Sequence, residues 1–168
     1  IMDNNNKILN QGEEGEVCIR GENVTSGYEN NPDANKNSFS NGWFRTGDQG
    51  YFDKDGYLKI SGRLKEIINK GGEKISPLEV DNILMDHPNI EQAVCFGYED
   101  KMLGEDIASA IIIKEGMQCT EDDIKIYANE KLAKFKIPKK IFFVNEIPKG
   151  ATGKLQRNTL AKKFGLVN

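Results

Sequence analysis

Two adjacent glycines, Gly71 and Gly72, lie among basic residues in the stretch GRLKEIINKGGEKISPLEV, which covers residues 62–80. Because glycine has no Cβ atom, a narrow ligand can pass close to the backbone there. The neighbouring Lys70 and Lys74 would favour a negatively charged ligand such as a phosphate. We therefore expect a contact for a narrow, anionic ligand or, on the alternative interpretation, a simple connector between two domains.

A carboxylate, Asp48, ends the segment GWFRTGD, where a Thr-Gly turn after an aromatic run would hold it at the end of a strand. A fixed carboxylate can accept hydrogen bonds from two neighbouring hydroxyls, which is how acidic residues bind ribose in nucleotide sites. An aspartate in a glycine turn also commonly caps its own backbone. Nucleotide binding and backbone capping are both open interpretations of this residue.

A third candidate, Lys154, lies in the segment PKGATGKLQR, residues 148–157. The GxxxxGK[ST] pattern of a phosphate-binding loop is not met, because Gly150 lies only three residues before Gly153 and Leu155 follows the lysine. The segment instead indicates a lysine on a glycine turn, suited to being brought to an anion that another surface holds.

The charges are distributed unevenly, although the net charge is only −3. Residues 131–168 contain ten Lys or Arg and a single acid, whereas residues 61–130 contain fifteen acids and seven basic residues. A basic end in an otherwise acidic chain indicates a phosphate-bearing partner, either a nucleic acid or a small molecule such as a nucleotide or coenzyme. A solvated basic surface is the alternative.

The composition is typical of a globular, intracellular protein of one or two small domains. Hydrophobic residues make up 38% of the 168 residues, enough for a core. No window approaches the ~18 consecutive apolar residues of a membrane span, and IMDNNNKILN lacks the layout of a secretory signal. The spacing of Cys18, Cys95 and Cys119 contains no CxxC pair, so we expect free thiols and no metal site.

The secondary-structure pattern changes near residue 63. Before it the chain is mostly β, with a strand at residues 16–20, a helical turn from Pro32 and a hairpin over residues 50–62. After it, helices alternate with strands. The expected strands cover residues 90–98, 107–114 and 141–144, and the expected helices start at Pro77 and cover residues 120–135 and 158–164.

Two of these helices carry capping signals. Ser76 with Glu79 forms a capping box, with Pro77 at the first helical position, and Thr120 with Asp123 caps the next helix. The pattern predicts an α+β fold with residues 1–62 as a mostly β part of one domain and residues 63–168 as a small α+β domain.

Four segments together resemble one protein family. FRTGD, GYLKISGRLKEIINKGGEKISPLEVD, LAKFKIPKK and PKGATGKLQR, in this order and spacing, resemble the final motifs of adenylate-forming enzymes, which include acyl-CoA synthetases, luciferases and peptide-synthetase adenylation domains. EVCIRGENVTSGYENNP and INKGGEKISPLEVD are similar to plant and fungal oxalate:CoA ligases. The resemblance implies ATP with Mg²⁺ and coenzyme A as cosubstrates of a carboxylic acid, and no membrane partner.

The resemblance also implies roles for single residues. Asp48 would bind the ribose hydroxyls of ATP, Arg63 would contact the nucleotide, Lys65 would be the hinge, and Lys154 would be the catalytic lysine of adenylate formation. The channel for coenzyme A would be formed by Gly71, Gly72, Glu73 and Lys74, and weaker candidates for coenzyme contacts are Lys136, Lys139 and Lys140.

The family's phosphate loop and acid-binding pocket have no counterpart in these residues. The chain resembles the C-terminal third of such an enzyme, with residues 1–62 as the tail of its large domain, and we expect it to be inactive alone. A fatty, short-chain or aromatic acid remains an alternative to oxalate. A carrier segment does not follow Arg157, which makes free coenzyme A the expected acceptor rather than a peptide-synthetase carrier.

A different class of function is a nucleic-acid-binding module that uses the basic end. The aromatic pair Phe142 and Phe143 lies in a strand-like IFFV run, so at least one ring should be buried rather than stack on bases. The C-terminal GLVN is not an SKL-type address, so we expect a cytoplasmic protein rather than a peroxisomal one.

Overall fold

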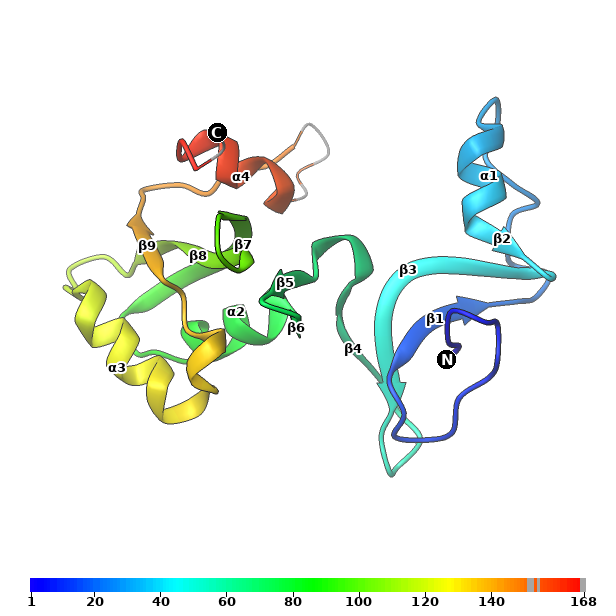
Figure 1. Cartoon of the computed structure of the whole chain (residues 1–168), viewed down its shortest axis with the longest axis horizontal. Helices are drawn as coiled ribbons and strands as arrows, with labels where there is room; N and C mark the ends of the chain where they lie inside the picture. The colour runs from blue at the N-terminus through cyan, green and yellow to red at the C-terminus, as the bar shows by residue number, and fades with distance from the viewer. Residues whose placement is uncertain (151–152, 154, 167–168) are drawn as a thin grey trace. The chain divides into compact units, whose positions relative to one another are not determined.

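The computed structural model describes residues 1–150, 153 and 155–166, and it divides the chain into two compact units, Ile1–Lys65 and Glu66–Asn168 (Figure 1). We call them unit 1 and unit 2. Their border lies three residues beyond the boundary expected from the sequence, inside a 3-10 helix, η1 (Leu64–Glu66). The mixed α and β content predicted from the sequence is confirmed.

Unit 1 is an antiparallel sheet with one short helix. Its elements are β1 (Gly15–Ile19), α1 (Pro32–Ser38), β2 (Phe39–Ser40), β3 (Trp43–Phe52) and β4 (Leu58–Arg63). The sheet order is β1-β3-β2, and β4 pairs with residues 48–52 of β3. The predicted hairpin is confirmed, because Asp53 Oδ1 accepts hydrogen bonds from the backbone N–H groups of Asp55 and Tyr57 and so closes the turn between β3 and β4.

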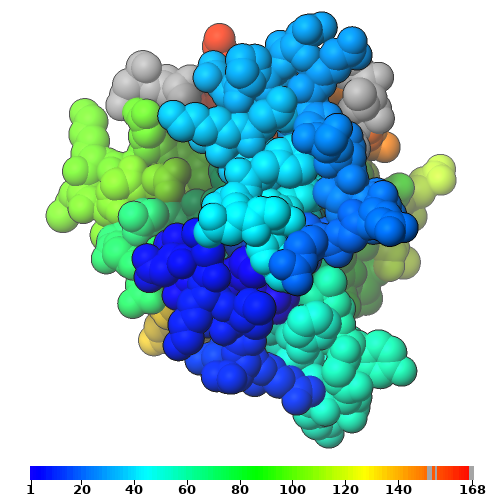
Figure 2. All heavy atoms as spheres, turned by 90° about the vertical axis from the view of Figure 1, so that its right-hand side faces the viewer, coloured from blue at the N-terminus to red at the C-terminus, as the bar shows by residue number. Residues whose placement is uncertain are grey.

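The core of unit 1 is small. Among the described residues its only buried hydrophobic side chains are Met2 and Val17. Apolar side chains of the β3–β4 hairpin are instead exposed, including Tyr57 at 67% and Ile60 at 48%. Figure 2 shows the surface of this unit in blue to cyan.

Unit 2 is built on a second sheet, of order β6-β5-β8-β7, with β9 parallel to β8. Its elements are β5 (Ile68–Lys70), β6 (Glu73–Ile75), α2 (Pro77–Met85), β7 (Ile90–Asp100), β8 (Gly104–Ile113), α3 (Glu121–Lys131), the 3-10 helix η2 (Lys134–Lys136), β9 (Lys140–Phe143) and α4 (Arg157–Lys163). No helix among the described residues is long and apolar enough to cross a membrane.

Both faces of this sheet are covered, which follows from the alternation of side chains along its strands. On β7, Ala93 and Cys95 belong to the core shared with α2 and α3, whereas Val94 and Phe96 belong to the core shared with α4. Because both sets are apolar, the strand reads as a continuous hydrophobic run. Helices therefore lie on both sides of the sheet, as Figure 1 shows for α3 and α4.

The structure corrects two details of the predicted helices. The helix after Thr120 ends at Lys131 rather than Phe135, because Leu132 is extended (φ −118°, ψ 151°) and stays in the core while the chain turns towards β9. The capping box of Thr120 and Asp123 is confirmed.

The other predicted capping box, that of α2, is not formed. Ser76 is the N-cap residue but makes no side-chain capping hydrogen bond to the helix. The Glu79 carboxylate instead binds Lys136, whose Nζ lies 2.6 Å from Oε1.

The two aromatic residues of IFFV differ in exposure. Phe142 is half-buried and stacks on Phe164 at a centroid distance of 4.4 Å, whereas Phe143 is 47% exposed. Among the cysteines, all free thiols, Cys95 is buried and Cys18 and Cys119 are half-buried.

Candidate functional site

Asp48 and Arg63 form an ion pair at the end of the β3–β4 ladder in unit 1. They are register partners, and Arg63 Nε lies 2.9 Å from Asp48 Oδ1. Arg63 Nη1 also donates to the Thr46 carbonyl, at 2.9 Å. Both side chains are accessible, at 32% and 53% exposed. The Asp48 carboxylate is therefore held by Arg63 and remains accessible to a ligand.

Residues 46–48 lie within the continuous strand β3, so the prediction of a Thr-Gly turn with Asp48 at a strand end is wrong. The pairing of β3 with β1 shifts register at this position, between Glu16 and Cys18. Gly47 has φ +75°, a left-handed conformation that favours glycine, and its N–H donates to Glu16 Oε1 at 3.0 Å. Glu16 is buried and accepts a second hydrogen bond from Arg45 Nε, at 2.7 Å. The backbone beside Asp48 is thus held by the ion pair that Glu16 of β1 forms with Arg45 of β3.

The double glycine forms the two-residue turn between β5 and β6 in unit 2. Lys70 and Glu73 are register partners, and Gly71 and Gly72 have φ of +60° and +96°. Two consecutive positive φ angles are the requirement of a type I′ hairpin turn, which favours Gly-Gly. A Cβ atom at Gly72 would meet no atom within 4 Å, so the glycine is required by backbone conformation and its surroundings are open.

A cluster of charges lies beside this turn. The buried Asp106 binds two cations, Lys70 with Nζ 2.6 Å from Oδ1 and Lys139 with Nζ 3.3 Å from Oδ2. Lys139 Nζ also lies 3.0 Å from Asp100 Oδ2. The hydrogen bond from Lys139, aided by two backbone N–H donors, lowers the pKa of Asp100 to about 2.

The other candidate lysines have different surroundings. Lys136 pairs with Glu79 on α2, and Lys140 Nζ lies 4.6 Å from the centroid of the Tyr98 ring, a cation–π contact. Lys74 and Glu73 are exposed on β6.

Lys65 is the last residue of unit 1 and lies in η1. Lys154 lies outside the described residues. Lys149 and Leu155, which come before and after Lys154 in the sequence, form a β-bridge. The structure thus brings Asp48 to Arg63 in unit 1. In unit 2 it links Lys70, which precedes the glycine turn, to Lys139 through Asp106.

Sequence reasoning missed the buried acids of unit 2. Asp81 lies on the inward face of α2 beside Val80, and Asp106 precedes an apolar β-run. A buried charge normally has a partner. An acidic residue within an inward-facing hydrophobic pattern is the sequence feature that could have indicated these buried acids. The sequence does not show which basic residue pairs with each of them.

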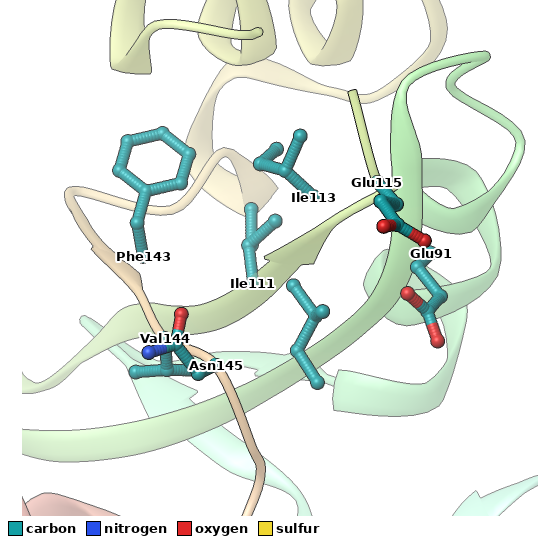
Figure 3. A pocket seen from close by; sticks show the side chains of 8 residues that line it. Glu91, Ile111, Ile113, Glu115, Phe143, Val144 and Asn145 are labelled. Carbon is teal, nitrogen blue, oxygen red and sulfur yellow. The ribbon is translucent and has the colours of Figure 1, made fainter. Parts of the chain in front are cut away.

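Two open pockets of unit 2 differ in their relation to these residues. One, of about 590 Å³, is lined by Tyr98, Asp100, Lys139 and Lys140 among others. The second, of about 370 Å³, is lined by Glu91, by residues 111–113 at the end of β8, by Glu115, and by residues 143–145 at and after the end of β9 (Figure 3). None of the predicted site residues lines it. Within residues 1–150, 153 and 155–166, no group of three or more His, Cys, Asp or Glu could hold a metal ion.

Comparison with known proteins shows to which family and to which enzymes the chain is similar. Residues 79–154 match the AMP-binding enzyme C-terminal domain. The chain is 53% identical to an oxalate–CoA ligase of Arabidopsis thaliana over 98% of its length and 32% of the relative, and 52% identical to one of Saccharomyces cerevisiae over 98% and 31%.

A solved structure has the same fold. The O-succinylbenzoate coenzyme A synthetase of Bacillus subtilis, in complex with ATP and magnesium, is 37% identical with a TM-score of 0.84, over 95% of this chain and 33% of that one. The chain therefore spans about a third of the length of these relatives.

Proposed function

We propose that the chain, whose residues 79–154 match the AMP-binding enzyme C-terminal domain, is the C-terminal part of an ATP-dependent acid:CoA ligase. The resemblance to adenylate-forming ligases predicted from four motifs is confirmed by the relatives above. The larger part of the enzyme would supply the acid pocket and most of the ATP site, so the 168 residues alone would be inactive.

The observation that carries the proposal is the fixed carboxylate of Asp48. Arg63 binds one carboxylate oxygen of Asp48, the side chain is 32% exposed, and the neighbouring Gly47 N–H donates to the buried Glu16. Such a group can accept hydrogen bonds from two ribose hydroxyls, and the guanidinium beside it adds a positive charge near the nucleotide phosphates.

Two half-reactions follow from this assignment. In the first, a carboxylate oxygen of the acid bonds to the α-phosphorus of ATP while the bond to pyrophosphate breaks. Two anions must approach each other, so a cation at the reacting phosphate lowers the barrier, and single groups of this kind contribute about 3–4 kcal/mol. We assign this role to Lys154. Mg²⁺ would accompany the phosphates as part of the substrate.

In the second half-reaction, the thiol of coenzyme A releases its proton and its sulfur bonds to the acyl carbonyl carbon, while the bond from that carbon to the phosphate oxygen breaks and AMP leaves. The turn at Gly71 and Gly72 suits the passage of a narrow thiol arm, because neither glycine has a side chain and the space beside Gly72 is open. We propose that unit 2 rotates about Lys65 between the two half-reactions, presenting Lys154 in the first and the glycine turn in the second.

Oxalate is the acid that we propose, because both curated relatives described above are named as oxalate–CoA ligases at more than half identity. The relative in Bacillus subtilis is named for a different acid, so a fatty or aromatic acid is the alternative.

The test uses the full-length parent enzyme with a panel of acids that includes oxalate. Pyrophosphate release should be fastest with oxalate and should fall strongly in Asp48→Asn, through weaker ATP binding. Asp55→Asn, an exposed turn residue of the same unit, is the matched control and should retain activity. Release without any acid-dependent increase, or equal activity of Asp48→Asn and the control, would overturn the proposal.

A further inference from the structure

The residue before the glycine turn is tied to a buried acid. Lys70 Nζ lies 2.6 Å from Asp106 Oδ1, and the Asp106 side chain is 2% exposed. Asp106 Oδ1 also accepts a hydrogen bond from the Ile107 N–H, at 2.8 Å. A buried carboxylate with such partners is costly to separate from its cation. The end of β5 is therefore fixed to β8 at the position where the turn begins.

The turn itself is tied to the loop between β7 and β8. The Gly71 N–H donates to the Leu103 carbonyl at 2.7 Å. That loop is capped by Asp100, whose Oδ1 accepts the N–H groups of Met102 and Leu103 at 3.0 and 3.1 Å. Asp100 therefore sets the position of the carbonyl that holds Gly71.

Lys139 joins the two anchors. Its Nζ lies 3.0 Å from Asp100 Oδ2 and 3.3 Å from Asp106 Oδ2, so one ammonium bridges the acid of the loop and the acid of the sheet. The ion pairs therefore form one network, in the order Lys70, Asp106, Lys139 and Asp100. This network is connected to the turn by the hydrogen bond from Leu103 to Asp100 and by the one from Gly71 to Leu103. A pair of glycines is flexible by itself, and this network supplies the constraint that the glycines lack.

We propose that Lys70, Asp106, Lys139 and Asp100 are positioning residues that hold the glycine turn in place for thioester formation. The inference rests on the proposed function. It also gives Lys139 a role different from the coenzyme contact implied by family resemblance, because its ammonium is already shared between two carboxylates. Its effect on the reaction would pass through the turn and not through a phosphate.

The first experiment tests the network in the 168-residue chain, independently of any activity. Hydrogen exchange of the Gly71 amide, followed by NMR, should be at least about tenfold faster in Lys139→Met than in the unmodified chain, because local opening becomes easier. Lys139→Arg, which keeps the charge, should restore protection. The matched control is Lys59→Met, since Lys59 pairs with Asp53, the cap of the hairpin turn in unit 1. Unchanged Gly71 exchange in Lys139→Met would overturn the proposal.

The second experiment uses the full-length enzyme supplied with acyl-adenylate, with either coenzyme A or pantetheine as the thiol. Lys139→Met and Asp106→Asn should slow thioester formation by about 10- to 100-fold with both thiols, the range expected when a supporting change displaces a site. Adenylate formation should change far less. A defect with coenzyme A that disappears with pantetheine, which has no nucleotide phosphates, would show a direct phosphate contact and overturn the positioning role.

Failure of the proposed function has a different signature. An unmodified full-length enzyme that forms no thioester from acyl-adenylate overturns that function together with the positioning role. An active unmodified enzyme whose Lys139→Met variant keeps full thioester activity overturns the positioning role alone.

Discussion

At Gly72 the backbone has φ +96°, and a side chain there would point into open space. Two requirements therefore coincide at one residue. The type I′ turn needs a residue that tolerates positive φ, and the proposed channel needs the absence of a side chain. Substitutions of similar size but different backbone preference can separate the two.

We predict that Gly72→Leu lowers the free energy of unfolding of unit 2 by about 1–2 kcal/mol, the cost of a left-handed conformation for an ordinary residue. Gly72→Asn should cost less, since asparagine tolerates that conformation. Both should slow thioester formation in the full-length enzyme, because both place a side chain at the turn. Denaturant unfolding and the thioester half-reaction are the measurements. Full thioester activity in Gly72→Asn would mean that the glycine serves the turn alone.

Asp100 provides a prediction about pH. Its pKa in the folded protein is lowered to about 2 by the hydrogen bond from Lys139, against an ordinary value of 3.8. A lowered pKa means that the carboxylate stabilises the fold above pH 3.8 and that this contribution is lost as the pH falls towards 2. In an NMR titration Asp100 should remain largely ionised at pH 3, and Lys139→Met should raise its midpoint. A midpoint near 3.8 in the unmodified chain would contradict the ion pair.

At the scale of elements, a buried arginine fixes α4 to the rest of unit 2. Arg157, the first residue of α4, places Nε 2.9 Å from Glu66 Oε2 and Nη1 2.9 Å from Asp81 Oδ2. It also donates to the Cys95 carbonyl. Burial raises the pKa of Asp81, and the nearby guanidinium opposes this. Helix α4 is thus linked to α2, to β7 and to the residue that follows the proposed hinge.

Removal of that cation should strongly destabilise unit 2. Arg157→Met leaves the buried Asp81 without its charge partner, for which we expect a loss of about 3–5 kcal/mol in the free energy of unfolding. Lys162→Met, an exposed site on the same helix, should change it by less than about 0.5 kcal/mol. Urea denaturation followed by circular dichroism measures both. If Arg157→Met changed the free energy of unfolding as little as Lys162→Met does, the apolar contacts of α4 would suffice to hold the helix without the arginine.

At the scale of the whole molecule, the two units differ in their cores. Within the described residues, every buried hydrophobic side chain except Met2 and Val17 belongs to unit 2. Unit 1 exposes apolar residues of its hairpin, such as Tyr57 and Ile60. We propose that these residues belong to a larger domain of the parent enzyme, which fits a chain that spans about a third of its relatives.

The uneven cores predict different behaviour of the two units in isolation. A polypeptide of residues 66–168 should unfold in one cooperative transition, because burial of apolar surface is the main stabilising term. A polypeptide of residues 1–65 should show no cooperative unfolding. Calorimetry of both polypeptides provides the measurement. A sharp transition for residues 1–65 would show that the strand ladder of unit 1 suffices without a large core.

Much of the local structure could be predicted from the sequence, because its causes are local. The Thr120 cap, the hairpin turn at Asp53 and the strand alternation around Cys95 depend on residues within a few positions of one another. The motif order identified the family for the same reason, since each motif is a contiguous segment. The helix end at Lys131 was missed, because it depends on where β9 joins the sheet.

Only the tertiary structure decided which charges meet. Lys139 lies 39 residues from Asp100, and Arg157 lies 91 residues from Glu66. A lysine-rich segment in the sequence indicates a positive surface, but an ammonium held between two carboxylates supports a turn instead. The sequence by itself determined the family, the hairpin at Asp53 and most of the helices and strands of unit 2, but not the β5–β6 hairpin that contains the two glycines. The pairing of distant charges followed from the packing of strands and helices, because residues far apart in the chain become neighbours only when the sheet and its two helical layers assemble.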